Sequence, residues 1–432
     1  MTEHRKMDCD LLVIGAGMAG MVAAARAASL GIRTLLAGNS GSLIFVSGLM
    51  DYLGVYPVEA RESVDDPALG LADLRAADPD HPYGSVGHEQ ILQGFEFVKK
   101  VLAKAGLAYH LSGGRNLSVL TAMGTFKPSF MVPETMEKGT GLFGKTAKKT
   151  SLLVIDIKGL QGFSARQVAS GIQHRLARVI PLTVEIPGVS QTIPPIVLAQ
   201  LFEDPKVQEV FARQVLALSD KVDIAGMPAV CGVHTSLAVQ QRLEKMTGLP
   251  LFEIPGLPPS VPGLRLKNAF ETSLAASGVT FLSNVTIKDP VFNGKKFTLT
   301  GIADNRELSI SAGGVVLATG RFPGNGLHAR RERIVETIFH LNVHQPVTRS
   351  LWHGTDFLTR QGHPVNRSGI ETDGNFRPLN KRGAPVFDDL YAVGSILAHN
   401  DWIRLKSGAG VCLVSACAAV DRFHKRRSEA GK

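Results

Sequence analysis

Three glycines near the N-terminus have the spacing of a turn that binds phosphate. Gly15, Gly17 and Gly20 directly follow a continuous apolar run, Leu11 to Ile14, and open an alanine-rich segment with a helical pattern, Met18 to Ser29. In such a turn the first glycine permits a tight bend, the second lets a phosphate approach the backbone, and the third lets helix and strand pack closely. Free N–H groups and the positive end of the helix then face the anion. The spacing predicts a nucleotide-binding strand, turn and helix.

The second strand of this unit lacks the acidic residue that usually follows it. An Asp or Glu about 20 residues after the glycines normally accepts hydrogen bonds from the ribose of a dinucleotide. Here that position falls at Ala37, Gly38 or Asn39, and no acidic residue occurs between Leu11 and Met50. Either Asn39 or backbone carbonyls replace the carboxylate, or the ligand has no adenosine ribose, which would point to FMN.

Two further glycine-containing segments lie late in the chain. The first is an apolar strand that ends in the Ala-Thr-Gly turn 318–320, and the second is a strand at 390–394 followed by a glycine-rich loop and a helix. Their order resembles flavoproteins of the succinate dehydrogenase and fumarate reductase type. This resemblance implies a Rossmann-type FAD/NAD(P)-binding fold whose last helix points its N-terminus at the flavin and stabilises negative charge on the reduced ring. It implies flavin contacts at Gly320, Gly394, Ser407, Gly408 and Gly410.

Three longer segments resemble one family more closely. They are 47–51, which begins with Ser47 and Gly48, then 257–265 and 390–411. They look like the B subunit of anaerobic glycerol-3-phosphate dehydrogenase. The resemblance implies a noncovalent FMN, with FAD as the alternative, and Gly48 is among the predicted flavin contacts. It also implies two partners. One is a catalytic A subunit that carries FAD, and the other is a membrane-anchoring C subunit whose iron–sulfur clusters pass electrons to quinone. No histidine occurs at 11–50, where the fumarate reductase class attaches flavin covalently.

Polar residues beside these motifs are candidates for contacts with flavin or substrate. Hydroxyls follow the second strand of this flavoprotein class, and the serines here, which could equally form local turns, are Ser40, Ser42 and Ser47. Arginine and histidine bind a dicarboxylate and deliver a proton in the fumarate reductase class. The candidate catalytic residues are His399, Arg404, His353 and Arg321. His399 and Arg404 lie in the loop between Gly394 and Gly408, where they could bind a flavin phosphate, a substrate anion or a quinone headgroup.

The order of the predicted elements gives an α/β fold with a discontinuous nucleotide domain. Residues 1–108 form its first part, 109–262 an inserted second (cap) domain, and 263–432 its second part. Period-two patterns at 279–282, 297–302 and 308–310 predict a small antiparallel meander with a turn at Asn293 and Gly294. The chain then returns to the nucleotide domain.

Charge and cysteine content indicate the partners and the compartment. The formal net charge of +9 favours acidic partners, phosphates or an anionic membrane face. No nucleic-acid-binding module is visible, so nucleic acid is not expected as a partner. Four cysteines lack the spacing of zinc or iron–sulfur sites, so no metal site is predicted. No apolar run reaches the roughly 18 residues that span a bilayer. With a polar N-terminal segment, this predicts a cytoplasmic protein. The resemblance to the dehydrogenase family implies that partner subunits hold it at the inner face of the cell membrane.

Three functional hypotheses follow from these residues. The first is an electron-transferring flavoprotein subunit of a quinone-linked glycerol-3-phosphate dehydrogenase. The second is a free-standing flavin dehydrogenase or reductase of the fumarate reductase type that acts on a small acid. The third is a scaffold subunit whose nucleotide site is degenerate and empty. Flavin content and turnover without partner chains distinguish them.

Overall fold

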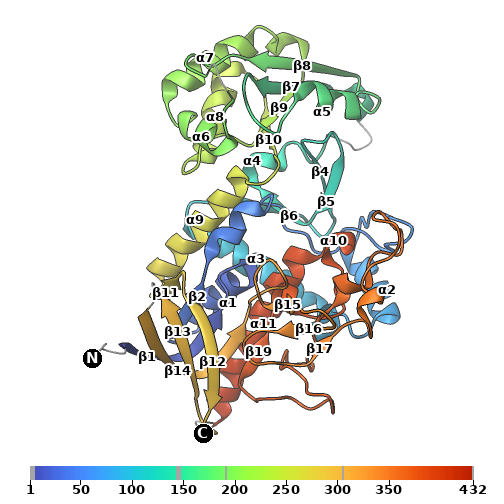
Figure 1. Cartoon of the computed structure of the whole chain (residues 1–432). Helices are drawn as coiled ribbons and strands as arrows, with labels where there is room; N and C mark the ends of the chain where they lie inside the picture. The colour runs from blue at the N-terminus through green and yellow to red at the C-terminus, as the bar shows by residue number, and fades with distance from the viewer. Residues whose placement is uncertain (1–4, 143–146, 190–191, 304–305, 431–432) are drawn as a thin grey trace. The chain divides into compact units, whose positions relative to one another are not determined.

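The computed structural model describes residues 5–142, 147–189, 192–303 and 306–430 (Figure 1). The chain divides into two compact units, each described by itself below. The first unit consists of Met1–Ser42, Asp51–Val101 and Phe270–Lys432, and the second of Leu43–Met50 and Leu102–Ala269. The segment Leu43–Met50 thus groups with the second unit, whereas the predicted limits placed it in the nucleotide domain. The predicted limits of the cap domain, 109–262, remain a prediction.

The first unit is built on a mainly parallel sheet. Its path is β11-β2-β1-β14-β13-β12, and β19 also pairs with β14. The parallel strands are β1 (Arg5–Ile14), β2 (Thr34–Gly38), β11 (Thr280–Ser283), β14 (Arg306–Leu317) and β19 (Leu390–Ala392). Strands far apart in sequence are neighbours, since Ile14 lies opposite Leu317 in β14 and Ala37 in β2. The predicted discontinuous α/β fold is confirmed.

The predicted meander is correct for two of its three segments. The segments 297–302 and 308–310 lie in β13 (Phe297–Ala303) and in the first part of β14, which pair antiparallel. The third strand of the meander is β12 (Thr286–Phe292), which pairs antiparallel with β13. The segment 279–282 is not part of it, because β11 pairs in parallel with β2. A period-two pattern reports that one face of a strand is buried, but it does not identify the partner strand.

Two helices cover the centre of this sheet. The helix α1 (Met18–Ser29) has the predicted bounds, and α11 (Gly408–Ala430) is the helix predicted after the last glycine-rich loop. They pack against each other and both contact β14 (Figure 1). The remaining helices before and after these strands are α2 (Pro67–Ala77), α3 (His88–Lys104), α9 (Val261–Ala276) and α10 (Trp402–Leu405).

Short two-stranded ladders follow β14 in the chain. One joins β15 (Leu327–Ala329) to β16 (Ile334–Glu336), and the other joins β17 (Val343–His344) to β18 (Gly369–Ile370). They fix the backbone of the region before the last glycine motif.

Among the described residues, no helix is both long enough and apolar enough to cross a membrane.

The second unit contains a four-stranded parallel sheet of order β10-β9-β7-β8. Its strands are β7 (Ser151–Ile157), β8 (Arg178–Val184), β9 (Ile224–Pro228) and β10 (Leu251–Ile254). The helices that connect them are α5 (Ala165–Ile172), α6 (Pro195–Leu201), α7 (Pro205–Leu216) and α8 (Ser236–Thr247). In chain order the strands lie 2-1-3-4, the order of a doubly wound fold. The predicted cap is therefore a second parallel α/β unit.

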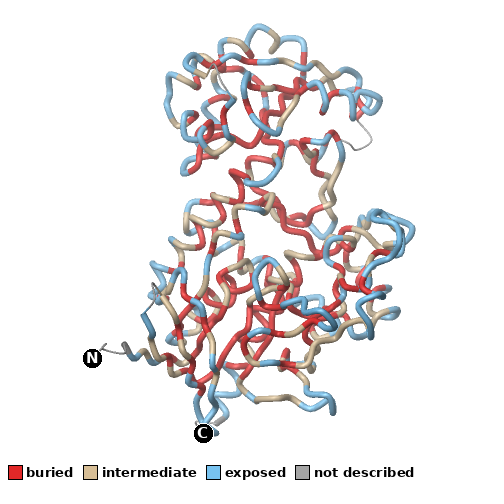
Figure 2. The backbone as a smooth tube through the Cα atoms, in the orientation of Figure 1, coloured by how far each residue is buried: buried red, intermediate tan, exposed pale blue. Residues whose placement is uncertain are grey.

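The rest of the second unit is small. It contains the part of α9 up to Ala269 and the helix α4 (Glu134–Glu137). It also contains two ladders, β3 (Tyr109–Leu111) with β6 (Met131–Pro133) and β4 (Leu117–Leu120) with β5 (Phe126–Ser129). The central strands of both units are buried (Figure 2). In the second unit, Leu153 and Ile155 on β7 pack in one cluster with Phe202 and Phe211. Each unit therefore has a core of its own.

Candidate functional site

The three glycines of the N-terminal turn have different structural roles. A Cβ on Gly15, whose φ is +105°, would lie 2.4 Å from the carbonyl oxygen of Ala318, and one on Gly20 would lie 1.7 Å from that of Gly15. A Cβ on Gly17 would meet only the Ser42 hydroxyl, at 3.5 Å. The protein's own packing thus requires the outer two glycines. The space at Gly17, the N-cap of α1, matches the closeness that a phosphate needs.

The late glycine motifs converge on the same turn. The N–H of Ala318 donates to the carbonyl of Ile14 at 2.8 Å, just before Gly15. A Cβ on Gly394 (φ +77°) would lie 2.6 Å from Cβ of Ala19 on α1. One on Gly320 (φ +69°) would lie 3.2 Å from the Ser395 hydroxyl. The three predicted motifs therefore meet at the carboxyl edge of β1, β14 and β19.

The hydroxyl of Thr319 lies at this convergence. Among the described residues, its buried Oγ1 has no hydrogen-bond partner. A buried polar atom without a partner costs free energy unless a ligand or water satisfies it. The open space at Gly17 and this unpaired hydroxyl both fit a bound flavin nucleotide.

The end of β2 has a carboxylate that the local sequence does not reveal. The hydroxyl of Ser40 donates to Glu271 Oε1 at 2.6 Å, and Glu271 belongs to α9. Asn39 donates to Asn284 at 2.8 Å and accepts the N–H of Gly41 at 2.7 Å. The missing carboxylate favoured FMN at the level of sequence. The folded protein removes that reason, because α9 brings an acidic residue to this strand.

Two of the predicted flavin contacts belong to the second unit. The Gly48 carbonyl accepts the hydroxyl of Tyr109 at 2.9 Å, and a Cβ on Gly48 (φ +81°) would lie 2.7 Å from Cβ of Pro262. The Ser47 hydroxyl accepts the N–H of Leu49 at 3.4 Å, as in a local turn. Packing within the second unit accounts for this glycine, and a flavin role for both residues stays a prediction.

The start of α11 is held by buried hydrogen bonds. Ser407 donates to Asn400 Oδ1 at 2.9 Å, and the same oxygen lies 3.2 Å from Nε2 of His81. The N–H of Gly410 donates to the carbonyl of Asp51 at 2.7 Å. A Cβ on Gly410 would lie 2.1 Å from the hydroxyl of Tyr83, whereas one on Gly408 would meet only Trp402, at 3.3 Å. Gly410 is therefore required by packing, and Gly408 leaves the helix end more open.

The buried His81 predicts an acid-sensitive first unit. Burial lowers the pKa of His81 to about 4, below its ordinary value of 6.5. The neutral ring accepts the N–H of Tyr83 at Nδ1 and therefore donates to Asn400 from Nε2. Because the folded pKa is depressed, the stabilisation is complete above pH 6.5 and is lost as the pH falls towards 4.

This acid sensitivity can be measured by comparing denaturant unfolding between about pH 7.5 and about pH 4.5 with that of His81→Asn. The variant should be less stable at neutral pH, because it loses the buried ring that accepts the Tyr83 N–H. It should lose less stability on acidification, because asparagine does not titrate. Parallel curves for the two proteins would show that His81 does not carry the dependence.

The structure separates the four predicted catalytic residues. Arg321 donates to the carbonyls of Leu397 (2.9 Å) and Asn400 (3.0 Å), and so holds the loop that carries His399. Burial lowers the pKa of Arg321 to about 10. Arg404 instead donates to the Gln361 carbonyl at 2.8 Å. The exposed His353 lies beside His363, with ring centroids 5.3 Å apart. Arg321 thus holds the loop that carries His399. Arg404 and His353 instead contact Gln361 and His363, which lie in a different segment of the chain.

Sequence reasoning missed two residues beside His399. Glu371 Oε1 lies 3.1 Å from Nε2 of His399 and 3.2 Å from Nδ1 of His344. The pKa of His344 is lowered, mainly by burial and to a smaller extent by the charge of the nearby His399. Neither residue belongs to a recognised motif, and only the folded chain brings them together.

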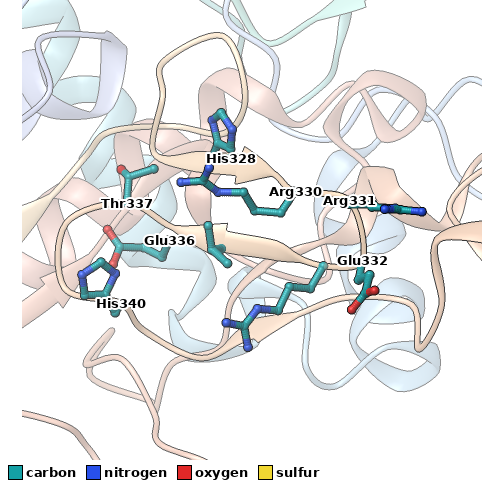
Figure 3. Close-up of a pocket in the computed structure, with 9 residues that line it drawn as sticks. His328, Arg330, Arg331, Glu332, Glu336, Thr337 and His340 are labelled. Atoms are coloured by element: carbon teal, nitrogen blue, oxygen red, sulfur yellow. The ribbon is translucent and has the colours of Figure 1, made fainter.

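A large cavity of the first unit is lined by other residues. Its volume is about 710 Å³. The arginines and histidines that line it lie on or near the hairpin β15–β16: His328, Arg330, Arg331 and His340, which Figure 3 labels, and Arg333. Glu336 on β16 accepts the N–H groups of Ile338, Phe339 and Leu341. None of the predicted flavin or catalytic residues lines this cavity.

A family model agrees with the convergence of the glycine motifs. The model described as FAD binding domain matches residues 10–411. The chain belongs to this family of FAD-binding domains. The protein is thus a flavin oxidoreductase by family, and it combines parallel sheets and helices as predicted.

The resemblance to one dehydrogenase family is also confirmed. A protein of Vibrio cholerae named as the B subunit of anaerobic glycerol-3-phosphate dehydrogenase is 29% identical over 429 residues, which cover 96% of this chain and 97% of that protein. Proteins of the same name in Aliivibrio fischeri and Yersinia enterocolitica are 26% and 27% identical, again over 96% of this chain and over 95% and 98% of their own lengths.

Solved structures are more distant. A 3-ketosteroid Δ1-dehydrogenase from Sterolibacterium denitrificans is 12% identical, with a TM-score of 0.45 over 97% of this chain and 100% of that chain. The open conformation of a flavocytochrome c3 fumarate reductase is 11% identical, with a TM-score of 0.44 over 97% and 78% of the two chains.

Proposed function

We propose that the protein is the flavin-carrying electron-transfer subunit of a quinone-linked glycerol-3-phosphate dehydrogenase. The overall reaction converts glycerol 3-phosphate and quinone into dihydroxyacetone phosphate and quinol, so two electrons and two protons leave the substrate and reach the quinone. The observation that carries the proposal is the convergence of the three glycine motifs at one edge of the sheet. The names of the relatives at 26–29% identity support the substrate.

The flavin is proposed to bind without a covalent bond. Gly15, Gly17 and Gly20 would receive its phosphate, while Thr319 and the N-terminus of α11 would face other parts of the nucleotide. Two observations favour FAD over the FMN expected from the sequence: the family is described by its FAD binding, and Glu271 lies beside Ser40 at the end of β2. Releasing the cofactor with acid and separating FMN from FAD tests this choice.

The proposed partners follow from the same relatives. They are named as one subunit of a dehydrogenase, which supports a complex with other subunits. In our proposal, a catalytic A subunit with FAD acts upstream of this chain. A C subunit with iron–sulfur clusters, which also anchors the complex at the cytoplasmic face of the membrane, would act downstream. The net charge of +9 would favour acidic partners or anionic lipids.

Electron transfer can be tested with two purified chains. An equimolar mixture of this chain and the A subunit is given glycerol 3-phosphate without oxygen, and the flavin bands should bleach to the extent expected for both flavins. This chain alone should stay oxidised. The matched control is the Gly17→Ala variant, prepared free of flavin. A mixture with this variant should show only the bleaching of the A subunit.

Other outcomes would favour the other hypotheses. Bleaching limited to the A subunit would contradict electron transfer to this chain. Turnover of fumarate by this chain alone with an artificial donor would indicate a free-standing reductase. A colourless protein that gains no flavin absorbance with FMN or FAD would indicate a scaffold.

A further inference from the structure

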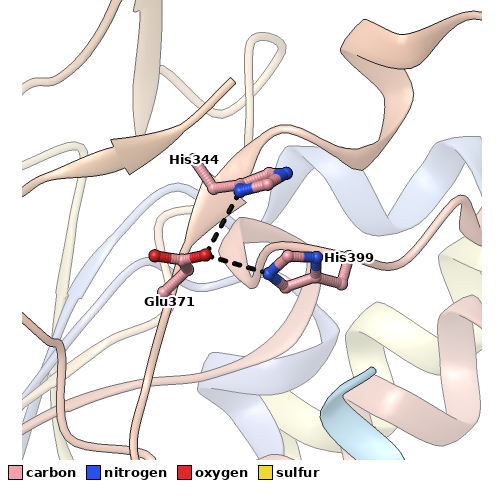
Figure 4. A group of neighbouring side chains, drawn as sticks. All are labelled: His344, Glu371 and His399. Carbon is pink, nitrogen blue, oxygen red and sulfur yellow. Dashed lines mark hydrogen bonds and ion pairs between the residues drawn. The ribbon is translucent and has the colours of Figure 1, made fainter. Parts of the chain in front are cut away.

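Three side chains of the first unit point at one another from separate segments. His344 ends β17, Glu371 follows β18, and His399 lies in the loop after β19. Figure 4 shows one nitrogen of each ring directed at the same carboxylate oxygen. The distances to Glu371 Oε1 are 3.2 Å from His344 Nδ1 and 3.1 Å from His399 Nε2. The three atoms all lie within 4.8 Å of one another.

The backbone holds this cluster in place. The ladder of β17 and β18 pairs His344 with Gly369, and the next bridge joins Ile370 to Leu397. The N–H of Ala398 donates to the carbonyl of Ile370 at 3.0 Å, and that of His399 to Arg367 at 2.9 Å. His399 adopts a φ of +65°, which is uncommon for a residue other than glycine. Main-chain pairing on both sides of the cluster therefore supports an unusual backbone conformation that directs the His399 ring at Glu371.

Two of the three separations between the ligand atoms are close to those around a tetrahedral cation. Zinc binds histidine nitrogen at about 2.0–2.1 Å and carboxylate oxygen at about 2.0–2.2 Å, which places neighbouring ligand atoms roughly 3.3–3.5 Å apart. The observed separations of 3.1 and 3.2 Å need only a small expansion. The side chains of His344 and Glu371 are each 40% exposed, and that of His399 is 13% exposed, so a cation has access from solvent.

We propose that His344, Glu371 and His399 bind a divalent transition-metal ion of the zinc class. Two imidazoles and one carboxylate supply three ligands, and the fourth position is open to water, as in catalytic rather than structural zinc sites. Arg321 holds the backbone on either side of His399, because it donates to the carbonyls of Leu397 and Asn400. The proposal concerns metal binding and does not depend on the proposed electron transfer.

The ligand spacing explains why the sequence predicts no metal site. The chain brings the three ligands together from three segments, and none of them is part of a short motif. The four cysteines, on which the sequence prediction relied, are free and not exposed. The competing interpretation is a carboxylate that accepts hydrogen bonds from two histidines and binds no metal.

Metal titration of the full-length protein separates these interpretations. After treatment with a chelator, the protein is titrated with Zn²⁺ against a chromophoric competitor, and separately with Co²⁺, whose visible spectrum reports tetrahedral coordination. We expect one Zn²⁺ per chain at this site. Glu371→Gln and His344→Gln should each weaken Zn²⁺ binding at least tenfold and remove the Co²⁺ bands. His399→Asn should do the same, since asparagine tolerates a positive φ.

The control is His424→Gln, which removes an exposed histidine on α11. Unchanged Zn²⁺ affinity in this variant would support the proposal. Thermal unfolding and circular dichroism identify any variant that fails to fold, and the two partly exposed positions, 344 and 371, provide independent folded variants. Failure of the unaltered protein to bind Zn²⁺ would overturn the proposal, as would equal affinity in Glu371→Gln and His424→Gln.

Discussion

Replacing Gly17 by alanine is expected to weaken flavin binding at least tenfold while leaving the fold intact. Gly17 has φ −78° and ψ −171°, an extended conformation that alanine adopts without strain. The new Cβ would meet no protein atom closer than the Ser42 hydroxyl at 3.5 Å. It would instead occupy the space through which a phosphate approaches the N-terminus of α1. A tenfold loss corresponds to about 1.4 kcal/mol.

The measurement is reconstitution of the flavin-free protein, followed by the quenching of flavin fluorescence. Gly374→Ala is the matched control, because Gly374 is exposed, has no positive φ and would place its Cβ in open space. It should bind flavin as the unaltered protein does. Gly15→Ala should lower stability as well as binding, since its Cβ would collide with the Ala318 carbonyl. Unchanged flavin affinity in a folded Gly17→Ala protein would contradict a phosphate site at this turn.

The nucleotide-binding turn could be predicted because its requirements are local. A strand buried on both faces needs a continuous apolar run, and Leu11, Leu12 and Val13 are fully buried. The helix after the turn has its predicted bounds, Met18–Ser29, because glycine begins it and Gly31, with φ +72°, follows its end. Both signals lie within a few residues of the elements that they define.

Features that depend on distant partners could not be predicted in this way. The segment 279–282 has a strand pattern, but only the crossover through α9 places this strand, β11, beside β2 in parallel. The Glu271 carboxylate reaches Ser40 from that same helix. His399 was predicted from its position in the loop between Gly394 and Gly408, whereas its neighbours His344 and Glu371 come from β17 and the residue after β18. Tertiary packing, rather than any local pattern, creates these contacts.

The second unit depends on a buried ion pair, and breaking it should cost about 3–5 kcal/mol. Arg265 donates from two nitrogens to the two oxygens of Glu253, at 2.6 and 2.8 Å. The carboxylate also accepts the Cys231 N–H and the Thr135 hydroxyl, each at 2.7 Å, and Arg265 donates to the Gly232 carbonyl at 2.9 Å. The side chains of Arg265 and Glu253 are only 2% and 0% exposed. The pair therefore joins α9, β10, α4 and the loop after β9.

Glu253→Gln should destabilise the unit because it leaves the Arg265 cation buried without its countercharge. Burial alone would raise the pKa of Glu253, but Arg265 and the hydrogen bonds hold it below its ordinary value. The stabilisation is then present above the unfolded pKa of about 4.3 and is lost as the pH falls through the lower folded value. Denaturant unfolding, followed by a signal from the second unit, measures the loss. The variant should also lack this acid dependence.

A matched control is Glu185→Gln, which breaks the exposed pair of Lys158 and Glu185 in the same unit. Those side chains are 60% and 68% exposed, with the charged atoms 2.8 Å apart. Exposed pairs contribute at most about 1 kcal/mol, so this variant should be nearly neutral. The double variant Glu253→Gln/Arg265→Gln should lose less than the sum of the single losses, because no uncompensated charge remains. Additive losses, or equal effects at the buried and the exposed pair, would mean that the network does not act as a unit.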